Sequence, residues 1–382
     1  MGSLYLGLAF LSAAALTFEI TLTRFFSVTQ WYHFAFLAVS VALLGYGASG
    51  TVLSLVPRWA RPPTARRTAM MSVLFAITVI GAFLSLNHLP FDSYRIAWER
   101  IQVFYLVLYY LALTVPFFCA GLVTGLLLAA YPEASARIYS ANLLGSAMGG
   151  LVPVLALPLL GEGIILLIAA VGFLAAFVFQ LPVSSTHTQT PRILRTIVLF
   201  AACLLLLGLA VYPPAPFQLR LSPYKGLSQV LRFPDAEVVW ERWNAFSQVD
   251  RVASSAIRSA PGLSLGYMGE LPVQDGLFVD GDDLSPVMAG TADLQEFVAH
   301  LPVALPYQLR PGGDVLVLEP KGGLDVWVAL AEAAASVVAV ESNPLLVQGA
   351  GDVYRDDRVE VVTEEGRGYA RRTMESFDVV HL

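Results

Sequence analysis

The chain has 382 residues, of which 56% are hydrophobic and 14% are charged, and its net charge is −6. Soluble globular chains average about 45–50% apolar and roughly 25% charged residues, so the composition excludes an ordinary soluble protein and predicts a membrane protein. The C-terminal half has no basic patch, which argues against nucleic-acid binding. The two cysteines, Cys119 and Cys203, lie in apolar runs, and we expect neither a disulfide framework nor a metal site.

The composition changes abruptly at about residue 213. Residues 1–212 contain ten arginines, no lysine and five acids, whereas residues 213–382 contain 13 basic and 24 acidic residues. The first apolar run has no basic leader and no small-residue cleavage site, so we expect no cleavable signal peptide. The pattern predicts a transmembrane helical bundle over 1–212, followed by a soluble part.

Seven segments have the apolar character of membrane spans, which need about 20 residues each. They lie at 4–23, 34–56, 69–88, 102–130, 140–160, 163–182 and 193–212. The weakest, 140–160, has small residues four apart at Ala141, Gly145 and Gly149. Such spacing lets helix backbones approach closely in lipid. It favours helix packing, and a substrate path between close helices is the alternative.

Glu19 and Arg24 flank the end of the first span. Ionisable groups inside a membrane are costly, which makes a transport or proton-relay role one interpretation. In the other interpretation, Arg24 reaches the membrane interface and pairs with Glu19 about one turn away.

One short loop is rich in arginine, and the positive-inside rule places such loops in the cytoplasm. Its arginines are Arg58, Arg61, Arg66 and Arg67. Seven full spans would leave the C-terminal part outside the cell, where a nucleotide-using domain is not expected. We therefore predict that 140–160 is re-entrant; the alternative is that the arginine rule does not hold for this loop. We expect the protein to lie in the cell (inner) membrane with its soluble domain in the cytoplasm.

Prolines end the last span at 212–216, because proline cannot continue a helix. After this linker, short apolar runs between Gly, Pro and Asp predict strands. These runs lie at 238–240, 249–252 and 276–281, and residues 292–304 have the periodicity of a helix. We predict a linker and a small β-rich region over 213–305.

Residues 306–382 alternate between apolar strand runs and helical segments. The expected strands are 314–318, 337–340, 359–362 and 377–380, with a helix at 325–334. This spacing is typical of the first half of a doubly wound α/β sheet. We predict a multi-span α-helical membrane domain joined, through the β-rich region, to an α/β Rossmann-like domain of the S-adenosylmethionine-dependent transferase type.

Residues at the strand ends suggest a nucleoside site. Gly322 and Gly323 follow the first strand, where glycine lets a ligand approach the backbone near a helix N-terminus. Glu341 ends the second strand, where an acid can accept hydrogen bonds from ribose hydroxyls. Glu365, after the third strand, can accept from an adenine amino group. The alternatives are a plain tight turn for the glycines and solvated acids for the two glutamates.

The segments that contain these residues resemble the spermidine synthase family, and more closely its membrane-fused relatives with a multi-span transporter-like domain. The resemblance covers about 222–382. It is carried by 315–325, 340–344 and 357–367, and upstream by Ser247-Gln248, Asp280-Gly281, Glu296 and His300. The family binds decarboxylated S-adenosylmethionine and transfers its aminopropyl group to a polyamine-type amine.

The resemblance implies roles for individual residues. Gly322, Gly323 and Asp325 belong to the glycine motif that lines the nucleoside, and Glu341 holds the ribose. Glu365 and Gly366 meet the adenine, and Gln248 touches the sulfonium end. The residues expected to bind the co-substrate are therefore Gln248, Gly322, Gly323, Asp325, Glu341, Glu365 and Gly366. The co-substrate is S-adenosylmethionine or its decarboxylated form, without a metal, and the expected partners are membrane lipid and an amine substrate, with a homo-oligomer left open.

The sequence departs from the family in three places. Residues 319–321 read Glu-Pro-Lys where the first glycine is expected, and Leu294-Gln295 replace a Tyr-His pair. The family's catalytic acid follows the fourth strand, so we expect it beyond Leu382 and expect this chain to be truncated and inactive. The alternatives are a methyltransferase, a transporter or sensor with a non-catalytic nucleoside domain, and a scaffold.

Overall fold

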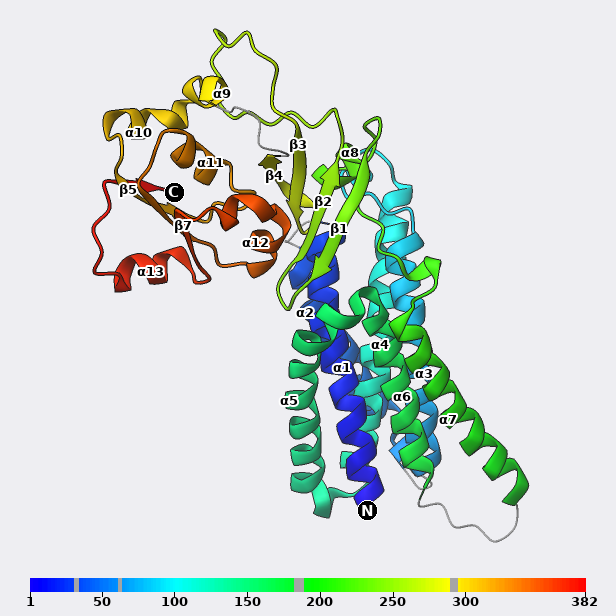
Figure 1. The fold of residues 1–382 in the computed structure, drawn as a ribbon. Helices are drawn as coiled ribbons and strands as arrows, with labels where there is room; N and C mark the ends of the chain where they lie inside the picture. The colour runs from blue at the N-terminus through cyan, green and yellow to red at the C-terminus, as the bar shows by residue number, and fades with distance from the viewer. Residues whose placement is uncertain (31–33, 61–63, 182–188, 289–294) are drawn as a thin grey trace. The chain divides into compact units, whose positions relative to one another are not determined.

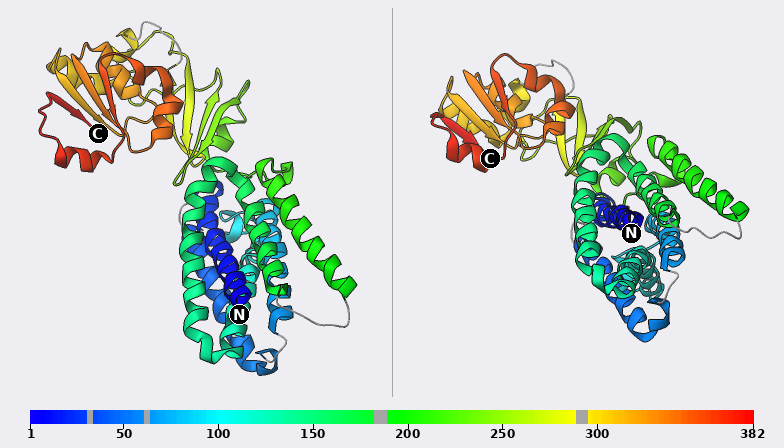
Figure 2. Two further views of the ribbon diagram at one scale, coloured as in Figure 1. Left: turned by 60° about the horizontal axis from the view of Figure 1, so that its bottom comes forward. Right: turned by 90° about the horizontal axis from the view of Figure 1, so that it is seen from below.

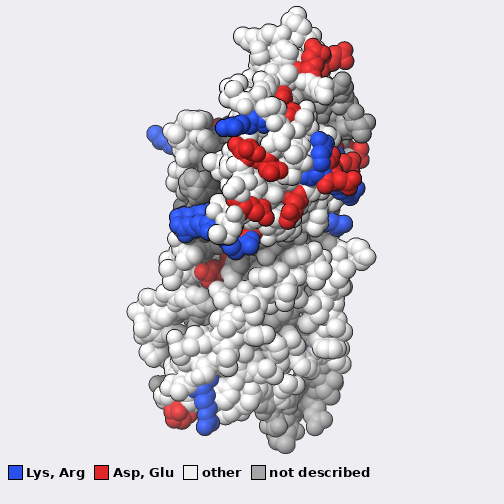
Figure 3. All heavy atoms as spheres, turned by 60° about the vertical axis from the view of Figure 1, so that its left-hand side comes forward, with Lys and Arg blue, Asp and Glu red and all other residues white. Residues whose placement is uncertain are grey.

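The computed structural model describes residues 1–30, 34–60, 64–181, 189–288 and 295–382. The chain forms two compact units, Met1–Ser222 and Pro223–Leu382 (Figure 1). On the face drawn in Figure 3, most charged side chains lie on the second unit, and the helical unit shows few.

The first unit consists of long apolar helices. They are α1 (Gly2–Thr29), α2 (Ala35–Leu55), α3 (Thr64–His88), α4 (Ile101–Ala130), α5 (Ser135–Leu160), α6 (Ile164–Gln180) and α7 (Gln189–Val211). Each predicted apolar segment overlaps one of these helices. Residue 182, at the end of the segment 163–182, and Arg61 of the arginine-rich loop lie outside the described residues. Within the described residues, six stretches are long and apolar enough to cross a membrane, and residues 132–180, which hold α5 and α6, count as one of them. The structure thus supports a membrane protein.

Helix α1 lies inside the bundle, with other helices around it (Figure 2). Its side chains Leu8, Phe18 and Phe25 are fully buried. Its buried residues lie on several faces, because α1 packs against α2, α4, α5 and α6. Glu19 is half-buried on this helix, and its role in transport or proton relay stays a prediction.

Small residues let α1 and α5 pack closely. A Cβ atom on Gly145 would lie 2.2 Å from the Ala9 carbonyl oxygen, and one on Gly149 would lie 2.3 Å from that of Ala13. Thr17 Oγ1 also donates a hydrogen bond to the Gly149 carbonyl at 2.9 Å. The stripe of small residues therefore serves helix packing, as the sequence favoured. Helix α5 is continuous over 26 residues, and its re-entrant placement in a membrane stays a prediction.

Substitution at this contact tests the packing. We expect Gly149→Ala to lower the free energy of unfolding by about 1–3 kcal/mol, because the added methyl overlaps the α1 backbone. Gly150→Ala is the matched control, since the nearest atoms to its Cβ lie at 3.8 Å and 4.0 Å. The measurement is the thermal unfolding midpoint of the detergent-purified chain. Equal midpoints for the two variants would contradict the packing account.

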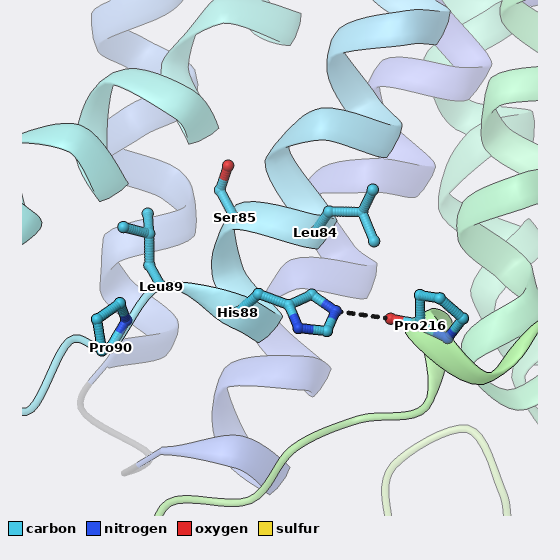
Figure 4. Close-up of a pocket in the computed structure, with 6 residues that line it drawn as sticks. All are labelled: Leu84, Ser85, His88, Leu89, Pro90 and Pro216. Carbon is cyan, nitrogen blue, oxygen red and sulfur yellow. Dashed lines mark hydrogen bonds between the residues drawn. The ribbon is translucent and has the colours of Figure 1, made fainter.

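The segment after α7 is hydrogen-bonded to the C-terminal end of α3. Asn87 Nδ2 donates to the carbonyls of Pro216 (3.1 Å) and Gln218 (2.6 Å), and Asn87 Oδ1 accepts from the Arg220 amide (2.7 Å). His88 Nε2 lies 3.2 Å from the same Pro216 oxygen (Figure 4). A hollow at this seam is lined by Leu84, Ser85, His88, Leu89, Pro90 and Pro216. Its mostly apolar lining and the buried Asn87 indicate that this region has a structural role in attaching the segment after α7 to α3.

The second unit begins with an antiparallel sheet in the order β1-β2-β3-β4. Its strands are β1 (Glu237–Trp243), β2 (Gln248–Ala253), β3 (Gln274–Val279) and β4 (Asp282–Met288). The first three overlap the predicted runs, of which 276–281 extends past the end of β3. Strand β4 was not predicted, because two acids and Pro286 lower its strand propensity. It lies at the sheet edge, where proline is tolerated.

A parallel sheet follows, with the strand order β7-β6-β5-β8. Its strands are β5 (Asp314–Leu318), β6 (Ser336–Val340), β7 (Val359–Val362) and β8 (Val379–His381), and all four overlap predicted strands. The helices of this unit are α8 (Gly226–Val230), α9 (Gln295–Ala299), α10 (Leu305–Leu309), α11 (Leu324–Ala331), α12 (Pro344–Ala350) and α13 (Gly366–Arg372). The predicted helix at 292–304 includes α9, and its residues 292–294 lie outside the described residues.

Both faces of the parallel sheet are covered. Val315 and Val317 face a large core, while Leu316 faces a smaller one with Tyr369 of α13. Such strands read as continuous apolar runs because neither face meets water. The large core also contains Leu277 of β3, so the antiparallel sheet and the parallel sheet share one hydrophobic interior.

Candidate functional site

The carboxyl ends of the parallel strands bring two glutamates side by side. The Glu319 amide, after β5, donates to the Val340 carbonyl at 2.8 Å, and the Glu341 amide, after β6, donates to the Val362 carbonyl at 3.0 Å. Each glutamate therefore continues the hydrogen-bond ladder of its own strand at the carboxyl end of the sheet, which we call the carboxyl edge. In open parallel sheets, ligands bind outside the carboxyl ends of the strands.

The turn at 319–323 is tightly wound and closely packed. Glu319, Lys321 and Gly323 have φ angles of 53°, 51° and 83°. A Cβ on Gly322 would lie 2.4 Å from the Pro286 carbonyl, and one on Gly323 would lie 2.5 Å from Val353 Cγ1. Both glycines are thus required by packing within the unit, which supports the tight-turn interpretation.

Three polar contacts hold this turn in place. The Gly322 amide donates to Ser285 Oγ at 3.0 Å, and Lys321 Nζ donates to Asp283 Oδ2 at 2.6 Å. Tyr354 Oη donates to the Lys321 carbonyl at 2.9 Å. The antiparallel sheet and the residues after α12 therefore fix the position of the turn above the parallel strands.

Glu341 is fully buried and serves as an internal brace. Its Oε2 accepts from the Lys321 amide at 3.1 Å, and its Oε1 accepts from the Asn343 amide at 2.8 Å. Burial raises the pKa of Glu341 to about 7, the charge of Glu319 adds to the rise, and the two backbone hydrogen bonds oppose it. The carboxyl group thus faces backbone amides and is not exposed to a ligand in this structure.

This buried carboxyl predicts a pH dependence of stability. The pKa of Glu341 is 4.5 when unperturbed and about 7 in the folded chain, so its contribution to stability is fully present below about pH 4.5 and is lost as pH rises through 7. We expect the free energy of unfolding to fall by about 1–3 kcal/mol between about pH 5 and pH 8 relative to Glu341→Gln, which does not ionise. The measurement is chemical unfolding of the full chain across this range. Exposed Glu360→Gln is the control, and a wild-type slope equal to that of Glu341→Gln would contradict the assignment.

Glu319 is exposed and bridges the ends of the neighbouring strands. Its Oε2 accepts from Ser342 Oγ at 2.8 Å and from the Ser342 amide at 3.3 Å, and its Oε1 accepts from the Gly366 amide at 3.3 Å. In the sequence, Glu319 is identified only as a bulky replacement within a glycine motif. Its position directly after a buried strand was the signal that could have identified it as a site residue.

Asp325 lies in the first turn of α11, where a negative charge is favourable. Its Oδ1 is 3.5 Å from His381 Nε2 at the end of β8. Burial raises the pKa of Asp325, and His381 opposes this rise. The glycine motif and the last strand thus meet at an acid–imidazole pair.

The remaining predicted residues are distributed around this edge. Glu365, the residue before α13, is exposed, and Gly366, the first residue of α13, is buried. Gln248 is buried on β2, where its Nε2 donates to Glu241 Oε1 and Asp250 Oδ1, both at 3.2 Å. The residue before Gln248 is Ser247, whose Oγ accepts from Asn343 Nδ2 at 2.9 Å. The β1–β2 turn therefore contacts the loop that follows Glu341, and the role of Gln248 toward a ligand stays a prediction.

No protein-family model matches the chain, and a search of curated proteins finds no match. Within the part of the chain that the structure describes, no group of three or more His, Cys, Asp and Glu side chains could hold a metal ion.

Proposed function

We propose that residues 223–382 bind the adenosyl part of decarboxylated S-adenosylmethionine and serve a membrane-anchored, spermidine-synthase-like aminopropyl transfer to an amine. The observation that carries the proposal is the strand order β7-β6-β5-β8 with acids at its carboxyl edge. The strands are all parallel, but β6 and β7 are added on one side of β5 and β8 on the other, so the strand order reverses between β5 and β8. Doubly wound Rossmann-like sheets bind nucleosides at such a reversal.

The charge at this edge supports a cationic co-substrate. Glu319 and Asp325 follow β5, Glu365 follows β7, and the nearby Lys321 is paired with Asp283. Decarboxylated S-adenosylmethionine carries a sulfonium and an ammonium and has no carboxylate or phosphate. An acidic edge attracts such a ligand and disfavours the phosphates that helix N-termini otherwise bind.

The proposed reaction balances without a metal or a redox partner. The acceptor nitrogen attacks the carbon beside the sulfonium, an N–C bond forms, and the C–S bond breaks with its electron pair going to sulfur. The products are methylthioadenosine and a substituted amine, and the proton released by the amine needs an acceptor. By the resemblance, the acid that takes this proton follows β8.

Ligand binding tests the proposal. We expect the detergent-purified full chain to bind methylthioadenosine at least about tenfold more tightly than S-adenosylhomocysteine, because the carboxylate of the latter meets the acidic edge. The measurement is calorimetric titration with each by-product, with ADP as the control ligand. Tighter binding of S-adenosylhomocysteine would point instead to methyl transfer. Binding of neither by a folded chain would refute the nucleoside site.

A further inference from the structure

Glu341, the acid that the resemblance predicts to bind the ribose, is not accessible to a ligand. Both carboxyl oxygens of Glu341 accept backbone hydrogen bonds, and its side chain is 0% exposed. A ribose hydroxyl could reach this carboxyl group only if the residues that cover it moved apart. Movement of the 319–323 turn would also break the hydrogen bond from the Lys321 amide, and a buried amide without an acceptor is costly.

Glu319 has the access that Glu341 lacks. It is exposed, and its carboxylate lies between the residue after β6 and the start of α13. The backbone and hydroxyl partners of Glu319 use one acceptor position at Oε1 and two at Oε2, and its side chain also shares a hydrogen bond with the Glu341 carboxyl group. Because Glu319 is exposed, a hydroxyl can reach its carboxylate from solvent without entering the core.

The backbone at this position is also unusual. Glu319 has φ +53°, in the left-handed region that favours glycine. A side chain is kept in this strained conformation only where its surroundings hold it, and such positions cluster at ligand sites. Lys321 and Gly323 in the same turn also have positive φ angles, of 51° and 83°.

We propose that Glu319, and not Glu341, supplies the carboxylate that binds the ribose hydroxyls of the nucleoside. The inference rests on the proposed function, because it names the acid that recognises the same ligand. Glu341 then acts as the brace that holds the 319–323 turn in place, through its hydrogen bond from the Lys321 amide.

A double-mutant cycle between protein and ligand tests this assignment. The probes are methylthioadenosine and its 2′,3′-dideoxy analogue, titrated into the detergent-purified full chain. We expect Glu319→Gln to weaken methylthioadenosine binding about tenfold and to leave binding of the dideoxy analogue unchanged, because a carboxylate accepts more strongly than an amide. Glu360→Gln is the matched control: this acid is exposed on β7, outside the loops at the carboxyl ends of the strands, and we expect neither affinity to change.

The outcomes separate the two proposals. Failure of the wild-type chain to bind methylthioadenosine refutes the nucleoside site itself, and with it the role of Glu319. Wild-type binding that Glu319→Gln leaves unchanged, or weakens equally for both ligands, overturns the ribose role alone. Tighter binding by Glu319→Gln also overturns it, because the Glu319 side chain would then hinder ligand binding. Thermal midpoints of both variants confirm that they are folded.

Discussion

The arrangement of the candidate site depends on one buried carboxyl group. Glu341 ends β6 and accepts the amides of Lys321 and Asn343, so it joins the loops after two adjacent strands. This contact holds a turn that runs through left-handed backbone at Glu319 and Lys321. The position of Glu319 at the sheet edge is a consequence of that turn. The energetic cost of burying an acid is thus linked to the geometry of the surface that we propose binds a nucleoside.

The helical unit is organised by a different constraint. Helices in lipid gain little from burying apolar side chains against one another, so close contact of backbones must stabilise their association. Gly145 and Gly149 provide this contact by letting α5 lie against the Ala9 and Ala13 carbonyls of α1. Thr17 adds a hydrogen bond across the same contact. This packing explains how a helix with apolar residues on every face is held in the interior of the bundle.

Much of the fold could be predicted from the sequence, because its signals are local. The segments of the first unit and the strand runs of the parallel sheet are apolar along most of their length, and the structure has a helix or strand at each. Strand β4 escaped prediction because Pro286 and two acids obscure it, and α12 and α13 are too short to show a helical period.

The site was less predictable because its geometry depends on tertiary contacts. The acids were found by their positions after strands, but the burial of Glu341 depends on the Lys321 amide folding back onto it. The sequence distance between these residues gives no sign of that contact. For the same reason Glu319 could not be distinguished from an unfavourable replacement of glycine.

Hydrogen–deuterium exchange of the detergent-purified full chain, with and without methylthioadenosine, tests the central claim most directly. The account predicts slower exchange at 319–323, 341–343 and 364–367, the three loops that meet at the carboxyl edge of the parallel sheet, with little change in α1 to α7. Ligand-dependent protection confined to the helices, or bound ligand without protection of these three loops, would contradict it.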